Sequence, residues 1–141
     1  MNLPSLCCSL PLAKRLKELG IKQGESLFIM RDDGGHVILN KKEDWDSNAD
    51  FYISVFTASE LGEMLPHGYV SGMTVWADSE KKWVCNWYYV DSQEIAKKSA
   101  YKEEIPYNQP IFGQTEADAR AKMLIYLLEN RLIHLKEQGI V

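Results

Sequence analysis

The sequence has few cysteines, no cluster of histidines and no long apolar run. Its three cysteines, Cys7, Cys8 and Cys85, are odd in number and two are adjacent, which is a poor disulfide framework. No apolar stretch is long enough to cross a bilayer, and no basic residues precede the apolar N-terminal segment as in a signal peptide. We therefore expect a protein of a reducing, cytoplasmic compartment without a membrane partner.

The motifs of common enzyme classes are also missing. The chain lacks the glycine loops that hold nucleotides and the G-x-S-x-G motif of serine hydrolases. Its histidines, His36, His67 and His134, stand far apart, whereas metal sites usually draw on closely spaced ligands. The sequence therefore identifies no catalytic residue, no cofactor site and no metal ligand.

Charge and length set broad limits on the partners and on the number of domains. The 16 basic and 20 acidic residues are interspersed and give a net charge of −4, so a nucleic-acid partner is unlikely without the basic stripe that phosphates require. With 141 residues, 45% of them hydrophobic, the chain can form one domain, residues 1–141, around its own core.

The first half of the chain predicts a helix, a hairpin and a strand. A helix is expected over 10–19, with Ser9 as N-cap and Gly20 ending it in the left-handed conformation. The apolar runs 27–30 and 37–39 flank "DDGG" and predict a hairpin, partly covered on both sides. A polar connection and a strand, "FYISVF", should follow; Phe51, Ile53 and Val55 share one parity in this strand.

The middle of the chain predicts a short helix and a second hairpin. Thr57 and Glu60 form a capping-box pattern, and Pro66 should stop the helix near Leu65. A loop, "PHGYVSG", then leads to a hairpin over 73–90 whose turn lies at 78–81. Period-2 alternation assigns one set of residues to the core face: Met73, Val75, Ala77, Trp83, Cys85, Trp87 and Tyr89. The opposite face would hold Thr74, Trp76, Val84, Asn86, Tyr88 and Val90.

The last third predicts a loop and a long helix. Residues 91–113 are charged and contain two prolines, so we expect an irregular segment. Thr115 should cap the final helix, with Asp118 at its third position. An apolar stripe marks its core face: Ala117, Ala121, Leu124, Leu128, Leu132 and Leu135, widened by Ile125 and Leu127.

Together these segments predict an α+β fold. Two hairpins and one strand would form a mostly antiparallel sheet of four to five strands. The long C-terminal helix and the N-terminal helix would pack on that sheet. A helix with so broad an apolar stripe contributes strongly to stability, since each fully buried leucine adds about 2 kcal/mol.

The surplus of aromatic residues is the strongest functional signal. Trp45, Tyr52, Trp76 and Tyr88 lie either in loops or at the parity opposite to the expected core face. If helices cover one side of the sheet only, Trp76 and Tyr88 would be exposed neighbours. Large rigid side chains of this kind favour partner binding, so Trp45, Trp76 and Tyr88 are the candidate partner-binding residues. The alternative is that other segments cover this face.

Three blocks of the sequence resemble small uncharacterised proteins encoded by bacteriophages and prophages. They are "LAKRLKELGIKQGESLF" at 12–28, "ISVFTASELGEMLP" at 53–66 and "TEADARAKMLIYLLENRLI" at 115–133. The resemblance implies a phage or prophage origin and a bacterial cytoplasmic setting. It implies no activity, no cofactor and no catalytic residue.

These observations favour a non-enzymatic phage or prophage accessory protein that acts by protein–protein interaction, with a protein partner or as a homo-oligomer. One alternative is an enzyme or metal-dependent hydrolase whose site gathers dispersed residues such as Asp44, Asp46 and His67. Another is a single-stranded nucleic-acid binder that stacks bases on its aromatic residues.

Overall fold

The computed structural model describes residues 6–65, 70–89, 109–131 and 133, and shows the expected α+β class. Side chains are described throughout these ranges except at 70–75, 86–89 and 109. The elements are α2 (Leu10–Glu18), β1 (Phe28–Arg31), β2 (Ile38–Leu39), α3 (Lys42–Ser47), β3 (Tyr52–Val55), α4 (Ala58–Met64), β4 (Val70–Ala77), β5 (Lys82–Tyr89), β6 (Gln109–Gly113) and α6 (Glu116–Glu129). No helix within the described ranges is long and apolar enough to span a bilayer.

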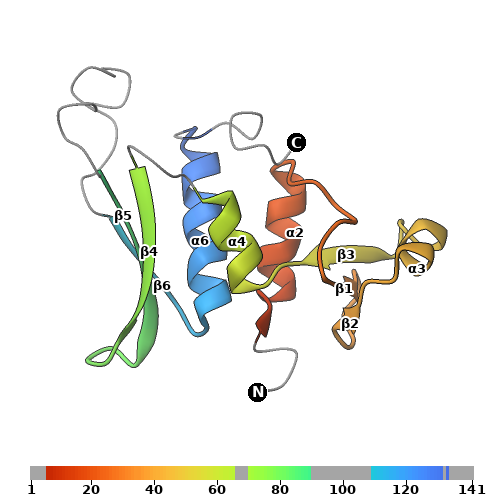
Figure 1. Cartoon of the computed structure of the whole chain (residues 1–141), viewed down its shortest axis with the longest axis horizontal. Coiled ribbons are helices and arrows are strands. Elements are labelled where there is room, and N and C mark those ends of the chain that lie inside the picture. The colour runs from red at the N-terminus through yellow and green to blue at the C-terminus, as the bar shows by residue number, and fades with distance from the viewer. Residues whose placement is uncertain (1–5, 66–69, 90–108, 132, 134–141) are drawn as a thin grey trace.

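The described strands form two antiparallel sheets rather than the single sheet of four to five strands that was predicted. One sheet has the order β2-β1-β3 and the other β4-β5-β6. Helix α6 lies in the middle of the molecule, between the second sheet on one side and helices α4 and α2 on the other (Figure 1). Helix α2 in turn contacts β3, so the N-terminal helix separates α6 from the smaller sheet. Helices α2, α4 and α6 therefore form an inner layer and do not simply cover one sheet.

Helix α2 confirms the predicted N-terminal helix and its glycine stop. Gly20 has a φ of +99°, and the N–H of Ile21 donates to the carbonyl of Leu16 at 3.0 Å, which closes the last turn. The Ser9 side chain makes no capping bond. The backbone N–H of Ser9 instead donates to the carboxylate of Asp118 in α6.

The first hairpin is confirmed, and β2 is a part of it that is not covered. Phe28 pairs with Leu39 and Ile29 with Ile38, and the "DDGG" turn uses positive φ at both glycines. Strand β2 lies at the edge of its sheet, and Ile38 and Leu39 keep 37% and 57% of their surface exposed. An apolar run therefore does not guarantee burial here.

The stretch after this hairpin differs from the predicted polar connection. Residues 42–47 form α3, whose Trp45 packs closely on the backbone of Gly24. The following strand is confirmed as β3, with Ile53 buried in the core, but Phe51 precedes the strand and is 63% exposed. Ser54 is fully buried despite its polar side chain, because its hydroxyl accepts the N–H of Gly24 at 2.8 Å.

Helix α4 begins with the capping box that the sequence predicts. The Thr57 hydroxyl accepts the N–H of Glu60 at 3.2 Å, and a Glu60 carboxylate oxygen accepts the N–H of Thr57 at 3.0 Å. The helix ends before Leu65, which has extended backbone angles. Of the loop predicted over 66–72, the part from Val70 onward belongs to strand β4, and residues 66–69 lie outside the described ranges.

The second hairpin is confirmed, but the predicted assignment of its faces is wrong. The register places Trp76 opposite Trp83 and Thr74 opposite Cys85, and directly paired residues point to the same side. With four residues between Ala77 and Lys82, an odd-numbered position on one strand faces an even-numbered position on the other. Trp76 therefore shares a face with Trp83, instead of lying on the opposite side.

Part of the predicted loop over 91–113 is a strand. Residues 109–113 form β6, which pairs with β5 and places Ile111 opposite Cys85 and Gly113 opposite Trp83. Residues 91–108 lie outside the described ranges. Pro110 did not prevent this strand because β6 is an edge strand, where a missing N–H can be tolerated.

Helix α6 confirms the predicted core face and extends it. Ala117, Ala121, Leu124, Ile125 and Leu127 are buried as expected, Leu128 is partly buried, and Leu132 and Leu135 lie outside the described ranges. Ala119 and Met123 are fully buried as well, although the predicted stripe did not contain them. The helix is covered more widely than predicted because both a sheet and two helices pack against it.

Candidate functional site

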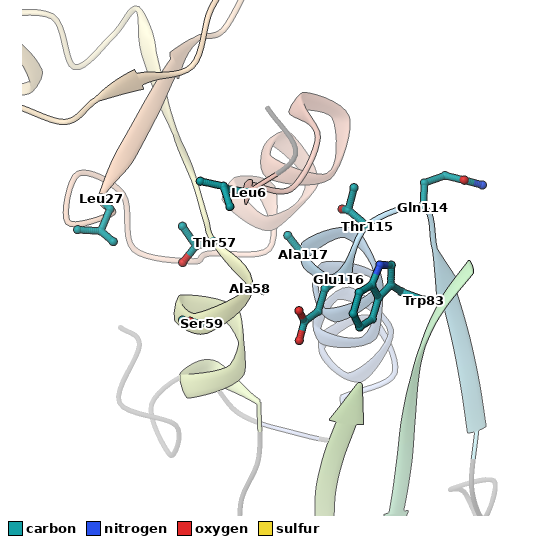
Figure 2. A pocket seen from close by; sticks show the side chains of 10 residues that line it. All are labelled: Leu6, Leu27, Thr57, Ala58, Ser59, Trp83, Gln114, Thr115, Glu116 and Ala117. Atoms are coloured by element: carbon teal, nitrogen blue, oxygen red, sulfur yellow. The ribbon is translucent and has the colours of Figure 1, made fainter. Parts of the chain in front are cut away.

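A groove of about 550 Å³ opens between the start of α4, the start of α6 and the beginning of β5. Leu27 and Thr57 face Glu116 and Trp83 across its opening (Figure 2). Its volume lies in the range that ligand pockets commonly have. The lining combines apolar and polar side chains: Leu6, Leu27, Thr57, Ala58, Ser59, Trp83, Gln114, Thr115, Glu116 and Ala117.

One wall of the groove is held by the carboxylate of Glu60. One oxygen of this carboxylate completes the capping box with Thr57, while the other accepts the N–H of Leu27 at 3.1 Å. The carboxylate thus ties the entry to β1 to the first turn of α4. Leu27 remains 56% exposed at this position. Its backbone is fixed, so its side chain is presented at the groove without a large loss of backbone entropy on binding.

The opposite wall is held to α4 by Arg120. Its guanidinium pairs with Glu116 at 3.0 Å and donates to the carbonyl of Ala58. Gly62 leaves room for this contact, since an added Cβ there would lie 2.8 Å from an Arg120 nitrogen and the end of the Arg120 side chain would have to shift. The two helix starts that line the groove are therefore bridged by one side chain, which keeps the groove at a defined width.

Trp83 forms the β-sheet side of the groove, and a second tryptophan packs against it. This is Trp76, which packs edge-on against Trp83 with ring centroids 5.8 Å apart. Trp76 is 46% exposed, and its indole nitrogen lies 3.4 Å from a carboxylate oxygen of Asp78. The predicted partner-binding residue Trp76 thus lies beside the groove, through its contact with Trp83.

The other predicted aromatic residues lie elsewhere. Trp45 belongs to α3 and lines a separate hollow. Tyr88 pairs with Ser71, which lies five positions before Trp76 on β4, so Tyr88 and Trp76 are not the neighbours that were predicted. The side chain of Tyr88 is not among those that the structure describes. Tyr52 is half-buried in β3.

Sequence reasoning missed most of the groove. Leu27 was predicted in a partly covered hairpin and is 56% exposed. Trp83 was predicted on the core face, and it packs against the core while it also lines the groove. Glu116 was not among the predicted site residues. No pattern in the sequence links these residues, since the groove forms only where five segments that are distant in the chain meet.

The alternative hypothesis, an enzyme site built from Asp44, Asp46 and His67, gains no support from the described residues. Asp44 and Asp46 lie on α3 with exposed side chains, and His67 is outside the described ranges. No group of three or more His, Cys, Asp or Glu side chains that could hold a metal occurs in the described part of the chain.

Cys7 and Cys8 are buried thiols with raised pKa values. Burial raises the pKa of Cys7 to about 11, and the charge of Glu60 adds to the effect. Burial raises the pKa of Cys8 to about 12, against the lowering effect of a hydrogen bond with the backbone of Phe56. Both thiols are therefore protonated near neutral pH, which disfavours a nucleophilic role.

Comparison of the chain with family profiles, with curated proteins and with solved structures finds no match. Its candidate contact residues are therefore those that the geometry of the groove identifies.

Proposed function

We propose that this chain is a non-enzymatic accessory protein that acts by binding another protein, and that the groove between α4, α6 and β5 is its contact site. The observation that carries this proposal is the exposed apolar surface at the groove. Leu27 is 56% exposed on one side and Trp76 is 46% exposed beside Trp83 on the other. Large apolar side chains left exposed around a concavity are typical of protein contact sites.

The surroundings of the groove support a macromolecular partner. Leu39 and Ile38 lie on the neighbouring edge strand β2 and are also exposed, and the N–H of Asn40 donates to the carbonyl of Leu27 at 2.8 Å. Exposed apolar side chains are therefore also present on the sheet edge that pairs with β1. Edge strands with exposed apolar residues favour contact with a further chain. Glu116 adds a polar group at the groove, in keeping with the mixed character of protein interfaces.

A phage or prophage origin and a bacterial cytoplasmic setting are part of the same proposal. They are supported by the three sequence blocks at 12–28, 53–66 and 115–133. Sequencing of the neighbouring genes tests this part: phage structural or regulatory genes on both sides are expected. A locus of housekeeping genes, with no phage gene nearby, would contradict it.

The contact site is tested with a matched pair of variants. Leu27→Asp places a charge in the groove, whereas Phe51→Asp places the same charge at a residue that is even more exposed, at 63%, and does not line it. Immobilised wild-type protein should retain a specific bacterial protein, and Leu27→Asp should weaken this retention at least tenfold. Such a loss is in the range expected when a central apolar contact is removed. Phe51→Asp should retain the partner.

Three outcomes would count against the proposal. Equal retention by folded Leu27→Asp and wild-type protein would remove the groove as the contact site. Equal losses in both variants would show a general effect of charge. Salt-dependent retention of the wild-type protein on single-stranded DNA, without any protein partner, would favour nucleic-acid binding. Sedimentation of each variant tests self-association, since a homo-oligomer formed through the groove should dissociate only in Leu27→Asp.

A further inference from the structure

A second hollow, of about 480 Å³, lies on the other side of the β1 entry, between the loop after α2 and helix α3. It is lined by Gln23, Gly24, Glu25, Ser26, Asn40, Lys42, Trp45 and Asp46. None of these residues lines the groove described above. The lining is mainly polar, with one indole, and so it differs in chemistry from the apolar groove.

The floor of this hollow is held rigidly by side-chain hydrogen bonds. The Gln23 side chain accepts the N–H of Ser54 at 2.9 Å, and the Ser54 hydroxyl accepts the N–H of Gly24 at 2.8 Å. Gly24 has a φ of +93°, and an added Cβ would lie 2.5 Å from the indole nitrogen of Trp45. Only glycine allows both this backbone conformation and this contact. The loop and the indole are therefore set in place before any ligand binds.

The side chain of Asn40 also ties the floor of the hollow together. Its side-chain nitrogen donates to the carbonyls of Gly24 and Ser26, both at 2.9 Å, which fixes the orientation of the amide. The opposite atom, Oδ1, is buried and accepts no hydrogen bond. This oxygen is closed to solvent, so Asn40 holds the floor of the hollow through its donor side and offers a ligand no direct contact.

Two opposite charges complete the lining. Lys42 and Asp46 are four positions apart on α3, both are exposed, and neither forms an ion pair with any residue that the structure describes. Glu25 is already paired with Lys22 at 2.8 Å. One available cation and one available anion therefore border the same hollow, beside an indole that can also attract a cation.

We propose that this hollow binds a small zwitterion, of the chemical class of free amino acids. The ammonium group of the ligand lies toward Asp46 and the Trp45 indole, and its carboxylate lies toward Lys42. An ammonium group alone would face the repulsion of Lys42, and a carboxylate alone would face that of Asp46. A zwitterion satisfies both charges.

The test is a titration of the ¹⁵N-labelled chain followed by NMR at the Trp45 indole N–H. Glycine and γ-aminobutyrate are the zwitterionic probes, while n-butylamine, butyrate and glucose are the comparators. At least one zwitterion should give a saturable shift, and the comparators should give weaker shifts or none. Asp46→Asn and Lys42→Met should each weaken binding about three- to fivefold, which is the range of an exposed ion pair.

Asp44→Asn is the matched control because it removes the same charge from the same helix at a residue outside the hollow. It should leave binding unchanged. The proposal is overturned if no zwitterion saturates the shift up to roughly 50 mM, where even weak specific binding would be seen. It is also overturned if glucose or n-butylamine binds as well as the zwitterions, or if Asp44→Asn weakens binding as much as Asp46→Asn. The spectrum of each variant shows whether it is folded.

Discussion

A carboxylate oxygen of Asp118, in the first turn of α6, accepts the backbone N–H of Ser9, the N-cap residue of α2, at 2.8 Å. The Thr115 hydroxyl at the same time accepts the N–H of Asp118 at 3.1 Å. In a capping box, the acid at the third position returns to its own N-cap. Here the acid caps a different helix, so α2 and α6 are joined at their N-termini.

Replacing Asp118 should loosen this junction. Asp118→Ala removes an acceptor for an otherwise unpaired helix N–H and a favourable charge at the start of α6, so we expect a loss of about 1–2 kcal/mol of unfolding free energy. Asp118→Asn keeps an oxygen acceptor and should lose roughly half as much. Urea denaturation followed by circular dichroism measures both. Equal stability of Asp118→Ala and wild type would show that the bond contributes nothing.

Gly113→Ala should be strongly destabilising. An added Cβ would lie 2.4 Å from the backbone nitrogen of Ala119, so β6 and α6 would have to move apart. We expect a loss of about 2–3 kcal/mol. Gly62→Ala is the control variant. The added Cβ meets only the end of the flexible Arg120 side chain, which can shift, and alanine is favourable in a helix interior. Thermal unfolding should show a clearly lower Tm for Gly113→Ala than for Gly62→Ala; the reverse order would contradict the close packing of β6 on α6.

Met123→Ala tests the wider burial of α6. Met123 is fully buried although it lies outside the predicted apolar stripe, so its truncation should cost about 2–4 kcal/mol. The neighbouring Lys122 is exposed, and Lys122→Ala should change stability by less than about 0.5 kcal/mol. Chemical denaturation of the two variants measures both changes in unfolding free energy. A small effect of Met123→Ala would mean that this side of α6 is not packed.

The thiols should make the fold sensitive to alkaline pH. Their ordinary pKa is 9.0, and burial raises that of Cys7 to about 11 and that of Cys8 to about 12. The unfolded chain therefore loses these protons first, so stability should fall as the pH rises from about 9 to about 12. A Cys7→Ala, Cys8→Ala double variant should show a smaller fall over this range. Iodoacetamide should also modify both thiols far more slowly in the folded chain than in urea, and equal rates would contradict their burial.

Local sequence was sufficient where an element depends on contacts within a few residues. The Thr57–Glu60 capping box, the Gly20 helix stop and the "DDGG" turn were all predicted because each is a short-range hydrogen-bond or φ preference. The core face of α6 was predicted for the same reason, since helical periodicity places its apolar residues on one side.

The faces of the second hairpin were misassigned because the parity between strands depends on the number of turn residues. Trp76 was therefore separated from Trp83, although they are paired. Strand β6 was missed because Gln109 and Pro110 have little intrinsic strand preference, and its pairing with β5 decides its conformation.

By itself, the sequence determined the α+β class, most helix and strand positions and the side of α6 that contributes most to the core, since these follow from interactions between near neighbours. Tertiary structure alone decided that the strands divide into two sheets around the helices, and that Leu27, Trp83 and Glu116 line one groove. The physical reason is that pairing between strands and packing between layers depend on contacts between residues far apart in the chain, which no local pattern specifies.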